Sequence, residues 1–336
     1  MRPLLGSLAI GGLLLGCSRQ DVNASAPDVA ILQAPSHPGL LLRMQSAPTQ
    51  TRFSGERQIW MRNGSDAAER VLAYSETVYA DGLGGFTIEP GTVTQPQLSS
   101  GQRDVFEILQ RAREGFLFRY RDFTIRDADL LTQNYTVQDT GTTVSVAGRN
   151  CTELRFDRQL APRRSYVVAV DQVTCLVLRI EELDASNLPT MRMEFTSFDP
   201  APDLTGLTMH QDLAATPIDP SSDTRLTLGF ALRLPQVLHG FQFVDAESVD
   251  YDGRTWARVH YHDGVEPLLY LYSSRVALPG GSLPAADDDL SKAQLVRVFT
   301  AGAWTIIQCK RGGNEFILAG KLDEPRLLET LRSAVE

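Results

Sequence analysis

The sequence predicts an α+β fold made mostly of antiparallel β-strands. Apolar and polar residues alternate in many short runs, as in the Met-Arg-Met-Glu-Phe-Thr run at 191–196. Such alternation is typical of half-buried strands with one wet face. Helical spacing is confined to a few segments, and the apolar stripes at 105–112 and 327–335 are the clearest of them. We therefore expect β-sheets accompanied by a small number of helices.

The start of the chain predicts export. Arg2 precedes an apolar run over residues 4–15, which is shorter than the roughly 20 residues that a membrane-spanning helix needs. The run closes with Leu-Leu-Gly-Cys, which resembles the lipobox of bacterial lipoproteins, so we expect Cys17 to be acylated and to become the first residue. The alternative is an ordinary secretory signal cleaved after Ala26. Both alternatives place the protein outside the cytoplasm.

Shifts in composition divide the rest of the chain. Residues 18–38 are rich in Ser, Asp, Ala and Pro without a sustained period, which is typical of a flexible tether. Stretches rich in Pro and Asp at 199–203 and 217–223 mark the end of a first domain. The predicted organisation is a lipoprotein signal peptide at 1–16, a tether at 17–38, a first domain at 39–205, a linker at 206–223 and a second domain at 224–336.

The individual elements follow from the same patterns. In the first domain, helices are expected at Gly39–Met44 and between Asp104 and Glu114. Asp323 and Pro325 predict the start of a terminal helix in the second domain. First-domain strands are expected at 52–61, 70–78, 86–88, from 116 onward, 150–157, 165–171, 175–183 and 191–196. Second-domain strands are expected at 241–250, 255–262, 266–273, 294–300, 303–309 and 314–319.

The charge balance argues against nucleic-acid binding. The net charge is −9, with 41 acidic against 32 basic residues, whereas phosphate contacts need clustered Lys and Arg. Two short basic clusters occur, at 111–121 and 155–164. Both alternate with acidic or apolar residues, so we interpret them as solvated faces of strands and helices.

Cys151, Cys175 and Cys309 remain after Cys17. A disulfide between Cys151 and Cys175 is the pair to consider in an oxidising compartment. The predicted strands that hold these two cysteines flank a middle strand, which separates them by roughly 9–10 Å. A disulfide needs Cα atoms within about 7 Å. The predicted strand order therefore disfavours this bridge without excluding it.

The sequence contains no complete catalytic or metal-binding motif. His260 and His262 share a strand face and with Asp263 could form half a metal site, but an exposed polar face is the simpler interpretation. Asp287–Asp289 lacks the glycine and distal glutamate of a calcium loop. A Gly-x-Ser-x-Gly elbow, a phosphate loop and His-Glu-x-x-His are absent from the sequence. A hydrolase would need a site that the sequence does not contain, so we expect no enzyme activity, cofactor or metal.

Large apolar side chains in the first domain are the feature that remains. They either fill a closed core or line a cavity for an acyl chain, and periodicity does not separate these alternatives. The candidate cavity residues are Phe53, Trp60, Phe106, Leu109, Phe116, Phe118, Phe156 and Phe195.

Several stretches, taken in order, resemble the MucB/RseB family of periplasmic sigma-factor regulators. The similarity covers about residues 40–336. In the first domain it is carried by Phe53-Ser-Gly55, Asn134-Tyr135, Val146-Ala-Gly-Arg149, Leu154, Tyr166-Val-Val-Ala-Val-Asp171, Thr174, Leu176-Val-Leu-Arg179 and Phe195-Thr-Ser-Phe198. In the second domain it is carried by Gly240-Phe241, Tyr261-His-Asp-Gly264 and Ala319-Gly320 with the helix that follows.

This resemblance implies a fold and a function. The first domain would be a LolA-like curved half-barrel sheet with covering helices and an apolar cavity, and the second a smaller sheet with a terminal helix. The protein would bind a lipid or acylated ligand and an anti-sigma factor or other envelope protein, and so regulate envelope stress signalling without catalysis. The alternative is a LolA-like carrier or sorting factor for lipids or lipoproteins.

The chain departs from the family pattern at its start. The regulators of this family are soluble in the periplasm, whereas Cys17 predicts a lipid anchor. Ser18 after the cysteine favours the outer membrane, which would hold the protein away from an anti-sigma factor in the inner membrane.

Overall fold

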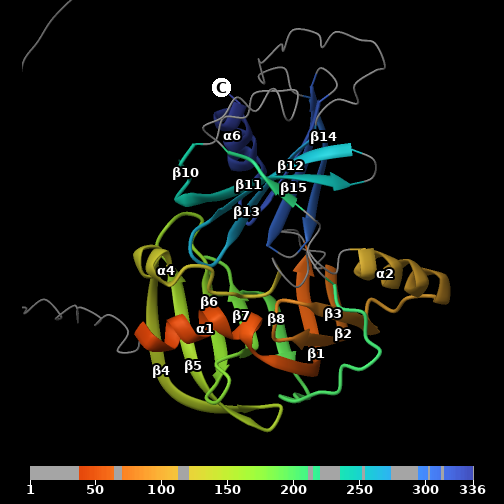
Figure 1. The fold of residues 1–336 in the computed structure, drawn as a ribbon, viewed down its shortest axis with the longest axis vertical. Helices are drawn as coiled ribbons and strands as arrows, with labels where there is room; N and C mark the ends of the chain where they lie inside the picture. Colours follow the sequence, from red (N-terminus) through yellow and green to blue (C-terminus); the bar gives the residue numbers. More distant parts are fainter. Residues whose placement is uncertain are drawn as a thin grey trace, which may run out of the picture. The chain divides into compact units, whose positions relative to one another are not determined.

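A computed structural model describes the chain from Pro38 to Val335 with internal gaps. Residues 34–336 form one compact unit, which contains two antiparallel sheets (Figure 1). The predicted fold class, mostly antiparallel β with few helices, is confirmed. Among the described helices, none has the length and apolar character needed to span a membrane. The described residues are 38–63, 70–112, 121–210, 215–219, 235–251, 254–273, 294–301, 303–311 and 314–335, so the predicted signal peptide, Cys17 and nearly all of the tether lie outside them.

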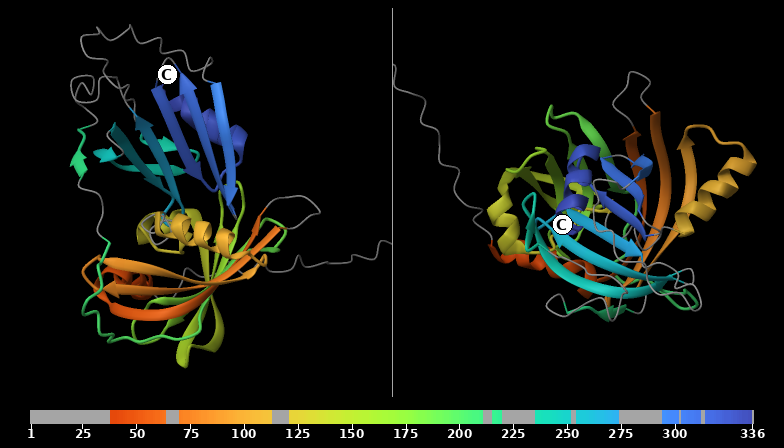
Figure 2. Two further views of the ribbon diagram at one scale, coloured as in Figure 1. Left: turned by 90° about the vertical axis from the view of Figure 1, so that its right-hand side faces the viewer. Right: turned by 90° about the horizontal axis from the view of Figure 1, so that it is seen from above.

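The first sheet has eight antiparallel strands and curves strongly about its own axis (Figure 2). One of its strand pairs, β1 with β8, joins segments that are distant in sequence, with Ile59 opposite Met193 and Met61 opposite Met191. In spatial order the strands are β3 (Phe86–Gln95), β2 (Arg70–Asp81), β1 (Arg52–Asn63), β8 (Pro189–Phe195), β7 (Val177–Leu183), β6 (Ser165–Asp171), β5 (Arg149–Arg158) and β4 (Tyr135–Val146).

Helices α1 (Pro38–Gln50) and α4 (Ala128–Asn134) lie across the hollow side of this sheet (Figure 1). Helix α1 buries Leu41, Met44 and Ala47, which are spaced three residues apart and therefore share one face. It runs one turn and a half beyond the predicted end at Met44. Helix α4 was not predicted, because seven residues are too few for a periodic signal. Helix α2 (Ser100–Ala112) packs against the edge strand β3 and corresponds to the predicted amphipathic helix.

The second sheet follows the predicted strands closely. Its terminal helix α6 (Glu324–Val335) begins at Asp323, whose carboxylate accepts a hydrogen bond from the Arg326 backbone N–H (3.0 Å), as the sequence predicts. The helix buries Leu327 and Leu331 in the core of this sheet. The strands are β9 (Ala215–Pro217) and β10 (Val237–Leu238), both paired with β11 (Phe241–Tyr251), followed by β12 (Arg254–His262), β13 (Pro267–Ser273), β16 (Asn314–Gly320), β15 (Trp304–Arg311) and β14 (Gln294–Ala301).

The predicted linker at 206–223 is partly ordered into this sheet. Thr216 in β9 lies opposite Ser248 in β11, and Ile218 is buried in the second core. An apolar side chain that enters a core draws its flanking backbone into a strand, so this stretch is more than a spacer.

Candidate functional site

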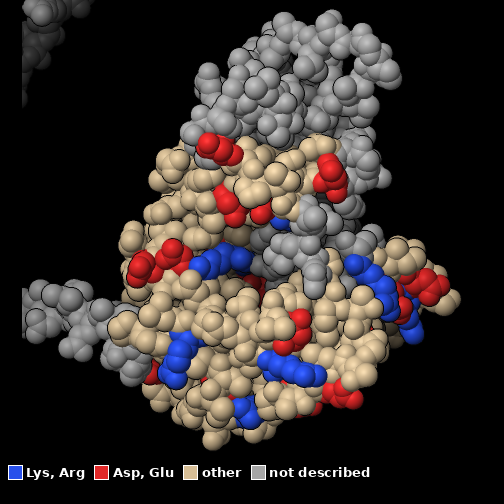
Figure 3. Space-filling view, in the orientation of Figure 1, with Lys and Arg blue, Asp and Glu red and all other residues tan. Residues whose placement is uncertain are grey.

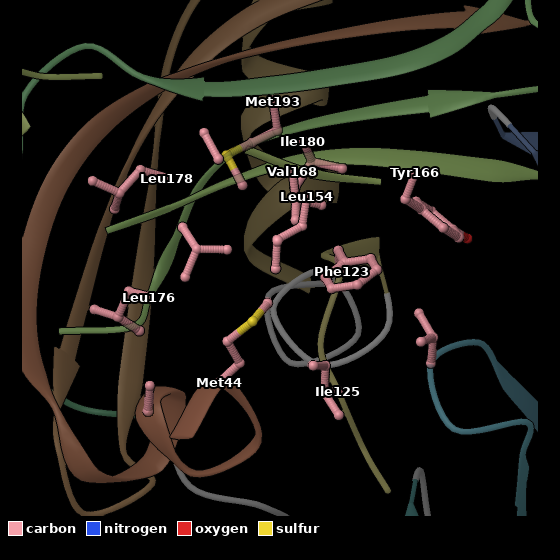
Figure 4. Close-up of a cluster of buried hydrophobic side chains, with 14 of the residues drawn as sticks. Met44, Phe123, Ile125, Leu154, Tyr166, Val168, Leu176, Leu178, Ile180 and Met193 are labelled. Atoms are coloured by element: carbon pink, nitrogen blue, oxygen red, sulfur yellow. The ribbon is translucent and has the colours of Figure 1, made fainter. Parts of the chain in front are cut away.

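The concave face of the first sheet is built by strand alternation. On β8, Met191, Met193 and Phe195 are buried, whereas the intervening Arg192 and Glu194 are exposed. The same period of two continues on the neighbouring strands, because successive side chains of a strand point to opposite faces. The inward side chains form an apolar wall that faces α1 (Figure 4).

A cavity lies between this wall and two segments that cross it. Met44 and Pro48 of α1 close one side, and residues 122–125 close another, with the ring of Phe123 towards Tyr166 of the sheet (Figure 4). The cavity volume is about 60 Å³, which is space for about four water molecules. Pockets that bind small molecules usually measure about 300 Å³ or more. The sheet side is lined by Phe53, Arg57, Leu176, Val177, Leu178, Ile180, Met193 and Phe195.

The structure brings part of the predicted cavity set together. Phe53 and Phe195 line the cavity, with ring centroids 6.2 Å apart. Phe156 is fully buried behind the cavity wall, where its ring lies 4.9 Å from that of Phe123. Phe106 lies on α2 and packs edge-on against Tyr74, so it belongs to the rim of the core and does not line the cavity.

Trp60 lies on the opposite face of β1. It is half-buried beneath the guanidinium of Arg192, 5.9 Å from the ring centre. Seven residues separate Trp60 from Phe53, and an odd separation on a strand places two side chains on opposite faces. The spacing of Phe53 and Trp60 in the sequence already placed them on opposite faces, and Trp60 does not line the cavity. The side chain of Leu109 and residues Phe116 and Phe118 lie outside the described part of the chain.

Buried charges next to the cavity are the feature that sequence patterns missed. The face seen in Figure 3 carries interspersed charges of both signs, but Arg57, Glu76 and Arg121 are each at most 3% exposed. Glu76 accepts hydrogen bonds from Arg57 (2.7 Å) and Arg121 (2.6 Å). Asp122 lies 2.7 Å from Arg57 and 2.8 Å from Arg121. We call these four residues the floor cluster, because Arg57 and Asp122 also line the cavity.

The electrostatics of the floor cluster are dominated by Glu76. Burial alone would raise the pKa of Glu76, but the two guanidinium groups outweigh it and lower this pKa to about 2. Burial raises the pKa of the neighbouring Tyr74 hydroxyl to about 12. Glu76 is therefore charged at neutral pH and fastens Arg121 to the sheet, and Arg57 of β1 holds Asp122. Because residues 123–125 follow directly, this attachment positions one wall of the cavity.

A second group of buried charges joins the two sheets. Arg158 on β5 donates to Asp263, which follows β12 (2.7 Å), and both side chains are fully buried. Tyr166 on β6 donates to Glu266 (2.6 Å) and accepts from Lys321 after β16 (2.8 Å). We call this group the junction cluster; it also contains Tyr135, Arg164 and Glu182. The expectation that the basic stretches at 111–121 and 155–164 are solvated is therefore wrong for Arg121, Arg158 and most of Arg164.

The histidine strand does not gather the half metal site considered from the sequence. Asp263 is buried in the junction cluster, whereas His260 bonds Asp245 across the strand pair (2.6 Å). Within the described residues, Asp245, Glu247 and His260 are close enough to hold a metal ion. Each of the two carboxylates already has a protein partner, because Glu247 accepts both Nε and Nη2 of Arg258. Cross-strand ion pairing explains this group.

The three cysteines within the described residues are free thiols. Cys151 on β5 and Cys175 in the turn before β7 are both buried and unbridged. Burial raises the pKa of the Cys151 thiol to about 11, so it is protonated at neutral pH and behaves as a small apolar side chain.

Comparison with known proteins gives one family match and several structural neighbours. Residues 108–213 match the family described as MucB/RseB N-terminal domain, which confirms the predicted resemblance. None of the curated proteins compared with the chain matches it. Among the solved structures, the MucA/MucB complex of Pseudomonas aeruginosa is similar at 17% identity with a TM-score of 0.46, and the match covers 87% of this chain and 96% of that chain. A crystal structure of MucB is similar at 17% identity with a TM-score of 0.45, and the match covers 88% of this chain and 95% of that chain. A putative outer membrane lipoprotein-sorting protein domain from Vibrio parahaemolyticus is similar at 8% identity with a TM-score of 0.20, and the match covers 51% of this chain and 93% of that chain.

Proposed function

We propose that this protein is a non-catalytic regulator of envelope stress signalling. It binds an acyl chain of a lipid or acylated ligand in the cavity of the first sheet, and a protein partner through another surface. The observation that carries this proposal is the cavity between the concave wall and α1, whose lining is apolar apart from Arg57, Asp122 and Thr124. The match of residues 108–213 to the MucB/RseB N-terminal domain supports it.

Ligand entry requires the cavity to widen. Its volume of about 60 Å³ has to grow severalfold before it reaches the roughly 300 Å³ of an ordinary small-molecule pocket. Met44 on α1 and Met193 on β8 face the cavity from opposite sides, and unbranched methionine side chains repack at low cost. Outward movement of α1 would supply the rest, since the floor cluster holds residues 121–125 on the sheet.

The protein partner in this proposal is an anti-sigma factor or another envelope protein. Neighbouring structures of MucB were solved in complex with MucA, which motivates a partner of that kind. The anchor at Cys17 would place the protein on the periplasmic side of the outer membrane. Residues 18–38 would let it reach at most about 70 Å from its lipid, at roughly 3.3–3.6 Å per residue.

Native mass spectrometry of the full chain, extracted in mild detergent, tests the proposal. We expect co-purified lipid on the wild-type protein and at least tenfold less on Met193→Trp, whose indole would occupy the cavity. The matched control is Met61→Trp, because Met61 is also a buried methionine of the sheet but does not line the cavity. Thermal unfolding of both variants reports whether they fold.

Two outcomes would count against this function. A lipid-free wild-type protein would remove the ligand, and equal lipid on both folded variants would place the lipid elsewhere. A transfer assay between donor and acceptor vesicles then separates the regulator from the carrier, because a carrier releases its cargo to acceptor vesicles and a ligand-retaining regulator does not.

A further inference from the structure

One short segment connects the cavity with the second sheet. Residues 126–128, the relay segment, follow directly after residues 122–125, which line the cavity. On one side the relay segment is bonded to helix α1, and on the other it is bonded to the turn between β12 and β13 (residues 263–266). A helix, a cavity wall and a turn of the second sheet, which are distant in sequence, therefore meet at this segment.

Gln45 is the contact between α1 and the relay segment. Its side-chain amide donates to the backbone carbonyl of Arg126 (3.0 Å) and accepts from the backbone N–H of Ala128 (3.2 Å). The preceding residue of the helix, Met44, lines the cavity. Because one side chain makes both bonds, an outward movement of α1 either breaks them or pulls the relay segment with it.

The relay segment is fastened to the second sheet by three further hydrogen bonds. The Gly264 carbonyl accepts from the backbone N–H groups of Arg126 (2.8 Å) and Asp127 (3.3 Å). The Val265 carbonyl accepts from Nε of Arg126 (3.0 Å). The side chain of Val265 is 4% exposed and belongs to the core of the first sheet. The turn is therefore seated in the first sheet, and the relay segment holds it there.

Gly264 shows how closely this turn fits. Its φ of +104° lies in a region that favours glycine, and a Cβ at this position would lie 2.4 Å from the backbone nitrogen of Leu131 on α4. The backbones of the turn and of α4 are therefore in direct contact. Closely packed interiors transmit displacements, because they contain little free space to absorb them. A shift of the relay segment, which leads into α4, is consequently passed on to the turn.

We propose that α1 and the β12–β13 turn are coupled through the relay segment, so that an acyl-chain ligand in the cavity loosens the attachment of the second sheet to the first. The ligand is that of the proposed function, on which this part of the coupling rests. The cavity has to widen to admit it, and α1 is the wall that moves, since the floor cluster fixes residues 121–125. Gln45 then pulls on the relay segment, whose bonds to Gly264 and Val265 lie on its other side. Coupling between two sites is reciprocal, so release of the turn also loosens α1.

Amide hydrogen exchange of the detergent-solubilised full chain, followed by mass spectrometry, tests the coupling without ligand. Val265→Ala removes the two methyl groups that seat the turn, and we expect the amides of α1 to exchange about tenfold faster. Val249→Ala is the matched control, because Val249 on β11 is also 4% exposed but lies outside the core of the first sheet. The Cys175 N–H, which donates to the Asp171 carbonyl in the β6–β7 turn, should keep its rate in both variants. Equal α1 rates in the two variants, or faster exchange throughout Val265→Ala, would overturn the coupling.

A second arm adds lysophosphatidylglycerol with one myristoyl chain, and native mass spectrometry records its occupancy. Bound lysolipid should make the amides of the turn exchange about tenfold faster in the wild-type protein and less than about twofold faster in Gln45→Met. Methionine keeps the length of the side chain but makes neither bond to the relay segment. Gln50→Met is the matched control, because Gln50 is an exposed glutamine of the same helix, and it should respond as the wild type does.

Occupancy separates failure of the coupling from failure of the proposed function. Bound lysolipid with an unchanged turn, or with equal acceleration in Gln45→Met and Gln50→Met, would overturn the coupling and leave the ligand in place. A wild-type protein that binds no lysolipid would count against the ligand, and the comparison of Val265→Ala with Val249→Ala would still decide whether α1 and the turn are coupled.

Discussion

Replacing Glu76 by glutamine should destabilise the first sheet strongly and in a pH-dependent way. The substitution keeps the shape of the side chain but removes the negative charge that binds Arg57 and Arg121. The ordinary glutamate pKa of 4.5 is lowered to about 2 in the folded protein, which corresponds to about 3 kcal/mol of stability at pH 7. Because the folded pKa is the lower one, this stability is present above pH 4.5 and is lost as the pH falls towards 2. At pH 3 about 1 kcal/mol should remain.

Urea unfolding followed by tryptophan fluorescence at pH 7, 5, 4 and 3 measures this effect. The difference in unfolding free energy between wild type and Glu76→Gln should be about 3 kcal/mol at pH 7 and should shrink at each step below pH 5. Glu56→Gln is the control, since Glu56 is an exposed glutamate on the adjacent strand β1, and its effect should stay below about 0.5 kcal/mol. A pH-independent difference, or one below about 1 kcal/mol at pH 7, would refute the electrostatic account of the floor cluster.

Two further substitutions test packing and the junction cluster. Gly55→Ala should lower the unfolding free energy by about 1–3 kcal/mol, because the new Cβ would lie 2.4 Å from the backbone carbonyl oxygen of Ser197, just beyond β8. Thermal unfolding measures this loss. The control is Gly101→Ala, which should be neutral or slightly stabilising because the space around Gly101 is open. Tyr166→Phe should cost about 1–3 kcal/mol in urea unfolding, because it leaves the buried ammonium of Lys321 with one acceptor fewer. An unchanged urea midpoint for Tyr166→Phe would mean that its hydroxyl adds nothing to the junction cluster.

The alternation of apolar and polar residues predicted most of the strands, because each sheet has one solvent-exposed face and one buried face. The second sheet illustrates this, since the strand predicted at 303–309 is observed as Trp304–Arg311. The same parity rule could have located two members of the floor cluster. Arg57 has the parity of Phe53 and Ile59, and Glu76 has that of Tyr74 and Val78, so both point inward although they are charged. The sequence interpretation failed there because it assigned charged residues to solvent by type and did not use their position.

The rest of the cavity could not be predicted from local patterns. The strand predicted from 116 onward is not found over residues 121–127, and Glu76, the partner of Arg121, lies 45 residues earlier in the chain. The cavity exists because residues 121–125 cross the sheet, and the side chains that hold this crossing become neighbours only in the folded chain. Propensity and periodicity describe neighbours along one helix or strand, so they contain no signal for such a contact.

The floor cluster also bears on why the cavity stays open. Buried ion pairs are seldom more stabilising than apolar residues of the same volume, because removing charges from water is costly. Here, however, charged contacts determine the position of residues 121–125 by hydrogen-bond geometry, with four donor–acceptor distances of 2.6 to 2.8 Å. Apolar side chains at these positions would gain free energy by moving together until the space between them was filled. Directional bonds between Glu76 and the two arginines instead hold the crossing segment at a fixed separation from the concave wall, and the apolar side chains that follow it are left facing a cavity.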